Sequence, residues 1–236
     1  MDNTNQFVPS SYFGVWRRSL LENKQGKDTS SLVLWMQTRC SHADIRIPAS
    51  RPDFSEFSRL EEYSADALRW LATQQGFYGV THVQNDICQW QRLYDFQPSN
   101  GTRDIGKIAF TSAGEMLETG VEHVYLEIWH KVEGSHLNLE THIINGLNRY
   151  GESIPSYLLC AGEQLAFVRP RKASIPDANS MQAAIDLYQP NYETLLDWLD
   201  FEISFGQKID DEHWQITHSI HPFREGKMMG LSYEYA

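Results

Sequence analysis

Hydrophobic and polar positions alternate along most of the chain, a pattern typical of antiparallel strands. Three strands are predicted over residues 13–21, 31–38 and 43–47. Further strands are predicted over residues 78–83, 86–96, 106–111, 116–119, 123–132, 138–145, 157–160, 164–169, 201–206 and 213–220. Short turns such as Ser112-Ala113-Gly114 join neighbouring strands, which favours hairpins over crossover connections. The pattern therefore predicts a mainly β fold.

The hydrophobic period changes to that of a helix in two places. Residues 54–76 put Leu60, Leu68 and Leu71 on one helical face, and Gly76 follows as a stop signal. A second helical stretch covers about residues 179–200 and is interrupted near Pro190. We therefore expect two helical insertions, near residues 55–75 and 179–200.

The arrangement of so many consecutive antiparallel strands depends on how their edges are protected. Closure into an up-and-down barrel removes sheet edges more completely than an open sheet does. We therefore expect one β-barrel domain over residues 1–236. A two-sheet β-sandwich is the alternative, since it uses the same alternation of residues.

The first predicted strand contains Gly14-Val15-Trp16, which resembles the Gly-x-Trp signature of the lipocalin (calycin) superfamily. The resemblance implies a lipocalin-like barrel in which Trp16 packs over the closed end and Arg224 is its partner. The two helical insertions depart from the family pattern. The strings GVWRR, WMQT and ADIRIP, from residues 14, 35 and 43, also look like a group of uncharacterised bacterial proteins and imply no activity.

Composition narrows the class of partner. The chain has 20 basic and 31 acidic residues, a net charge of -11, so a phosphate backbone would be repelled and no nucleic-acid partner is expected. Residues 1–6 lack the features of a signal peptide, and no stretch is apolar enough to span a membrane. We expect a cytoplasmic protein without a membrane partner; a homodimer stays open. Its three cysteines predict neither a disulfide framework nor a zinc site.

Alternation also sorts polar and aromatic side chains onto common strand faces. If these faces line a barrel lumen, they enclose a polar cavity with aromatic walls, in which arginine side chains hold an anionic group and aromatic rings cover an apolar body. This interpretation predicts a site for a small amphipathic anion. The ligand-binding residues it selects are Arg18, Trp35, Gln37, Arg46, Trp90, Arg92 and Trp129.

Other functions remain open at this point. A cofactor-free enzyme would use Glu127 as acid or base and Tyr125 as a hydrogen-bond donor. An interaction module would use the outer sheet face or the helices. The same side chains also suit purely structural or solvated roles, with arginine stacked over tryptophan. No cofactor and no metal site is expected, because His123 and His130 point to opposite faces of one strand, as do His218 and His221.

Overall fold

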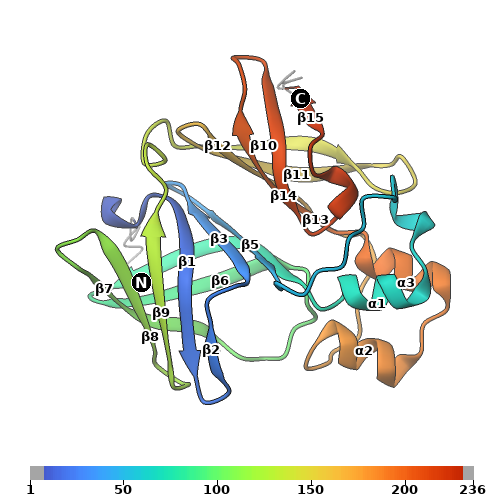
Figure 1. The fold of residues 1–236 in the computed structure, drawn as a ribbon, viewed down its shortest axis with the longest axis horizontal. Coiled ribbons are helices and arrows are strands. Elements are labelled where there is room, and N and C mark those ends of the chain that lie inside the picture. Colours follow the sequence, from blue (N-terminus) through green and yellow to red (C-terminus); the bar gives the residue numbers. More distant parts are fainter. Residues whose placement is uncertain (1–7, 231–236) are drawn as a thin grey trace, which may run out of the picture.

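The structure, a computed structural model, describes residues 8–230. Residues 1–6, on which the absence of a signal peptide was judged, lie outside this range. The chain forms a closed antiparallel β-barrel, a second curled sheet and three α-helices (Figure 1). The prediction of a mainly β fold with an up-and-down barrel and helical insertions is confirmed.

The barrel is a meander in which each strand pairs with the next along the chain, and β9 pairs back onto β1 from Trp16 opposite Lys131 to Asn23 opposite Tyr125. The short β2 and the longer β3 pair with successive halves of β1, so eight strands close the barrel and β2 extends one hairpin. The strands are β1 (Gly14–Asn23), β2 (Gly26–Asp28), β3 (Leu32–Gln37), β4 (His42–Ile47), β5 (Gln75–Gln84), β6 (Ile87–Asp95), β7 (Asp104–Phe110), β8 (Glu115–Gly120) and β9 (Tyr125–Lys131).

The remaining strands form a six-stranded antiparallel sheet of their own, in sequence order, and do not extend the barrel. They are β10 (Glu140–Leu147), β11 (Ser153–Ala161), β12 (Gln164–Arg169), β13 (Glu202–Lys208), β14 (His213–Ser219) and β15 (Met228–Gly230). The sequence pattern suits strands of either sheet, because it records alternation and not the partner of each strand.

The second sheet packs against one side of the barrel, where β4 contacts β13 and β3 contacts β11. Leu34, Met36 and Ile45 on the outer face of the barrel join Val168 and Ile203 of the second sheet in one buried cluster. Strands β3 and β4 are therefore buried on both faces, which explains the near-continuous apolar run from Leu32 to Met36.

The three helices gather at one end of the interface between the sheets (Figure 1). They are α1 (Ala65–Leu71), α2 (Met181–Tyr188) and α3 (Tyr192–Leu199). Ser64, Ser180 and Asn191 cap their first turns through side-chain oxygens that accept backbone N–H groups. The helices lie outside the barrel lumen and bury Leu68, Leu196 and neighbouring side chains in the shared cluster.

Candidate functional site at the open end of the barrel

One end of the barrel is filled by aromatic side chains. A 3₁₀ helix, Ser10–Tyr12, precedes β1 and brings the Tyr12 carbonyl 2.8 Å from the Trp16 indole nitrogen, which donates to it. The Tyr12 ring meets Phe110 edge-on at 5.2 Å, and the Lys131 ammonium lies 4.6 Å from the Trp16 ring centroid. Trp16 is fully buried here, so an opening to solvent has to lie at the opposite end.

Arg224 does not pair with Trp16, contrary to what the lipocalin resemblance implied. It lies beyond β14 and donates to Glu202 of the second sheet at 2.8 Å. The cation over Trp16 is instead Lys131, because the last strand of the barrel is β9 and not the last strand of the chain.

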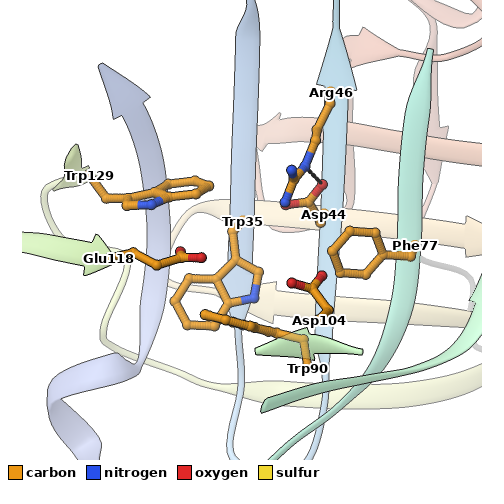
Figure 2. Close-up of a pocket in the computed structure, with 8 residues that line it drawn as sticks. All are labelled: Trp35, Asp44, Arg46, Phe77, Trp90, Asp104, Glu118 and Trp129. Atoms are coloured by element: carbon orange, nitrogen blue, oxygen red, sulfur yellow. Dashed lines mark hydrogen bonds and ion pairs between the residues drawn. The ribbon is translucent and has the colours of Figure 1, made fainter. Parts of the chain in front are cut away.

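The middle of the lumen contains a small inner chamber with aromatic walls (Figure 2). Its cavity volume is about 10 Å³, which is enough for a single water molecule. Figure 2 shows carboxylate and guanidinium groups directed between the rings from several strands. The lining residues are Trp35, Asp44, Arg46, Phe77, Trp90, Asp104, Glu118 and Trp129.

An outer chamber at the open end leads to the inner one, and Arg46, Asp104 and Glu118 line both. Its cavity volume of about 470 Å³ is within the range of small-molecule sites. The other residues that line it are Leu21, Asn23, Lys24, Gln25, Glu122, His123, Val124, Tyr125 and Glu127.

Each arginine selected from the sequence already has a carboxylate partner. These pairs bridge strands or brace one strand, and they hold the guanidinium groups in fixed positions. The pairs are Arg18 with Glu127 at 2.7 Å and with Asp28 at 2.9 Å, Arg46 with Asp44 at 2.8 Å, and Arg92 with Asp104 at 2.5 Å and with Asp95 at 2.8 Å.

Glu118 differs from the other lumen carboxyl groups, because it belongs to none of the ion pairs between described side chains. The Tyr125 hydroxyl donates to its Oε1 at 2.7 Å. Burial raises the pKa of Glu118 well above its usual value, and the neighbouring Glu127 raises it further. Gly106 on β7 makes room for this side chain, since a Cβ there would lie 2.9 Å from Glu118 Cγ.

Glu127 lies directly opposite Glu118 in the β8–β9 pair, so both side chains enter the lumen together. Burial raises the pKa of Glu127, while Arg46 and Arg18 act in the opposite direction. Two neighbouring carboxyl groups hold a proton more readily than either does alone, so the pair is chemically able to take up or give up a proton.

Two indole nitrogens of the inner chamber lack a partner. Trp35 Nε1 and Trp129 Nε1 are buried, and neither donates a hydrogen bond to an acceptor among the described residues. Buried N–H groups are nearly always satisfied in folded proteins, by protein atoms or by other molecules. The chamber therefore offers two donors to a water molecule or to an acceptor atom of a ligand.

The structure brings most of the residues selected from sequence to one place. Trp35, Arg46, Trp90 and Trp129 line the inner chamber, and Glu127 and Tyr125 line the outer one. Arg18 lies behind Glu127.

Arg92 and Gln37 lie outside both chambers. The Arg92 guanidinium covers the Phe77 ring at 3.8 Å and faces a groove beside the barrel mouth. Gln37 is fully buried in a separate network, where Thr81 donates to its amide oxygen at 2.5 Å and His42 Nδ1 lies 2.8 Å from the Thr81 hydroxyl. Burial lowers the pKa of His42 to about 3, so this network is uncharged.

Sequence reasoning missed four residues that shape the site. Asp44 shares a predicted face with Arg46 but was read only as part of that face, and Phe77 and Asp104 lie just before strands that were predicted to begin at residues 78 and 106. Glu118 alternates with the buried Met116 within a predicted strand, and this alternation is the signal that could have found it.

The described part of the chain contains neither a metal-binding cluster nor a helix that could cross a membrane. No cluster of three or more metal-binding side chains occurs among residues 8–230. Within the same residues, the helices are too short or too polar to cross a membrane.

Comparisons with known proteins give a fold and no function. No protein-family model and no curated protein matches the chain. Among solved structures, an uncharacterized protein from the yeast Saccharomyces cerevisiae superposes with a TM-score of 0.54 at 12% identity, over 94% of this chain and 91% of the yeast chain. That likeness shows the fold alone. Because the superposition covers nearly all of both chains, it includes both the barrel and the second sheet of this chain.

Proposed function

We propose that the chain is a lipocalin-like protein that binds a small molecule at the open end of its barrel. The observation that carries the proposal is the outer chamber of about 470 Å³, which joins a water-sized inner chamber between Trp35, Trp90 and Trp129. Ligand sites of this kind combine apolar walls with a few fixed polar groups. The filled opposite end, with Trp16 over it, supports a lipocalin-like arrangement with one entrance.

A thermal-shift screen of small amines, acids, sugars and lipids tests this proposal. A ligand present at 100 times its Kd adds about 2.7 kcal/mol to the free energy of unfolding, which raises the Tm of a chain of this size by roughly 5 to 10 °C. Leu21→Trp, which narrows the outer chamber, should abolish the shift. The control is Leu137→Trp at an exposed position that lines neither chamber. The proposal fails if no compound gives a saturable shift, or if Leu21→Trp binds as the unchanged protein does.

A second candidate is cofactor-free acid–base catalysis on the same barrel. It is favoured by the Glu118 and Glu127 pair, whose carboxyl groups have different partners and so suit different protonation states. In this candidate Glu118, held by Tyr125, is the acid and Glu127 the base. Single substitutions Glu118→Gln and Glu127→Gln should then abolish turnover of a bound compound while affinity is retained; loss of affinity with no turnover to lose favours binding alone.

A further inference from the structure

The charge of the outer chamber bears on what it binds. Four of its lining residues are acidic, Asp104, Glu118, Glu122 and Glu127, whereas two are basic, Lys24 and Arg46. Asp104, Glu122 and Glu127 are already paired with arginine side chains, so Glu118 is the acidic group without a cationic partner among the ion pairs of the described residues. A ligand cation would be attracted to it, and attraction between charges is strong where water is partly excluded.

The arginine side chains give a second argument against an anionic ligand. Arg18 and Arg46 are each in a short ion pair with Glu127 or Asp44, and Arg92 is held by two aspartates. An anion would have to displace one of these carboxylates, which leaves a buried charge unpaired and is costly. A cation leaves every pair intact.

Glu118 supplies the anchoring group for a cation. It is buried, is reached from both chambers and has no cationic partner among the ion pairs of the described residues. The groups facing it are Glu127 and Tyr125 of β9, Asp104 of β7 and Arg46 of β4. Three of these four groups are acidic or neutral, so a ligand cation would supply the positive charge that Glu118 lacks among them.

The indoles without hydrogen-bond partners are an independent observation in the same region. Trp35 Nε1 and Trp129 Nε1 are buried donors of the inner chamber without acceptors among the described residues. One water molecule in that chamber can accept from an indole and donate to Glu118. Above it, the Tyr125 ring offers a cation–π face, and Leu21 and Val124 at the rim cover an apolar body.

Building on the proposed binding function, we propose that the outer chamber takes a small organic cation, an ammonium or guanidinium group on an apolar body, whose charge pairs with Glu118. Below the raised pKa of Glu118 the empty protein carries this carboxyl group protonated. Binding in that pH range breaks the Glu118 O–H bond, and the proton passes to solvent. The ligand and the proton therefore compete for the same carboxylate.

Three probes of one shape and different charge test the inference: benzylammonium, benzyl alcohol and benzoate, titrated by isothermal titration calorimetry. At pH 8 we expect benzylammonium to bind at least about tenfold more tightly than the other two. Below the pKa of Glu118 its affinity should fall by up to about tenfold per pH unit, because the cation must displace a proton. Titration in two buffers of different ionisation enthalpy should show proton release by the unchanged protein.

Two single variants test whether Glu118 is the group that pairs with the cation. Glu118→Gln should lose the preference for benzylammonium and the pH dependence, while Glu115→Gln, on the opposite face of the same strand, should keep both. Equal or tighter binding of benzoate or benzyl alcohol overturns the cation inference and leaves the binding proposal standing. Binding of benzylammonium without proton release at any pH between 5 and 8 also overturns it. No saturable binding of the probes, together with a negative thermal-shift screen, overturns both.

Discussion

Replacing Arg18 with methionine tests how strongly the lumen depends on its ion pairs. The Arg18 side chain is 6% exposed and donates to Glu127, which is 5% exposed, and to Asp28, which is 30% exposed. Methionine keeps most of the apolar stem of the side chain and removes its charged, hydrogen-bonding end. Arg18→Met therefore leaves a buried carboxyl group without its nearest cation.

The expected loss of stability follows from the burial of both Arg18 and Glu127. Breaking a buried ion pair by removing one member typically costs about 3 to 5 kcal/mol. Arg46 also lowers the pKa of Glu127 and remains in the variant, and the bond to Asp28 is partly exposed. We therefore expect the free energy of unfolding of Arg18→Met to be about 3 kcal/mol lower, at the lower end of this range, and the Tm to fall by on the order of 10 °C.

The assay is urea unfolding at pH 7.5, followed by tryptophan fluorescence, for a double-mutant cycle. Arg18→Met with Glu127→Gln should lose only about 1 to 2 kcal/mol, because no buried charge is left unpaired. The control is Arg103→Met, which removes the same group from an exposed pair with Glu122 and should cost less than about 1 kcal/mol. The reasoning is refuted if Arg18→Met costs no more than Arg103→Met, or if the double variant is no more stable than Arg18→Met.

Three further predictions concern the residues around the site. Gly106→Ala places a Cβ 2.9 Å from Glu118 Cγ and should cost about 1 to 3 kcal/mol by crowding, so an unchanged urea midpoint would contradict the proposed fit. Since the pKa of Glu118 is raised in the fold, the folded state binds this proton more tightly than the unfolded chain. Stability should therefore decrease as pH rises from the ordinary pKa of a glutamate towards the raised one. Glu118→Gln should flatten that decrease in urea unfolding between pH 5 and 9, and an identical slope would argue against a buried, protonated Glu118. Cys40 is exposed, whereas Cys88 is buried with a raised pKa, so a thiol reagent should modify Cys40 in the native protein and Cys88 only after unfolding. Rapid modification that is lost in Cys88→Ser would show the opposite.

The interior face of the barrel could be read from the sequence because strand geometry is local. Side chains two residues apart point the same way, so Trp16 with Arg18, Asp44 with Arg46 and Glu127 with Trp129 share a face whatever the strands pair with. The helical insertions were readable in place but not in extent, since α1 covers only Ala65–Leu71 of the predicted stretch and Gly76, taken as its stop signal, lies in β5. These features need no knowledge of distant contacts.

The sequence by itself therefore determined the fold class, most of the strands and which side chains share a strand face; the short β2 and β15 were not predicted. Only the tertiary structure decided that β9 returns to β1 and closes the barrel, and that β10 begins a separate sheet. It also decided that Glu118 and Glu127 lie side by side, that Gln37 is enclosed with His42 and Thr81, and that Lys131 covers Trp16. The physical reason is that strand pairing joins residues more than 100 positions apart, and alternation carries no information about such partners.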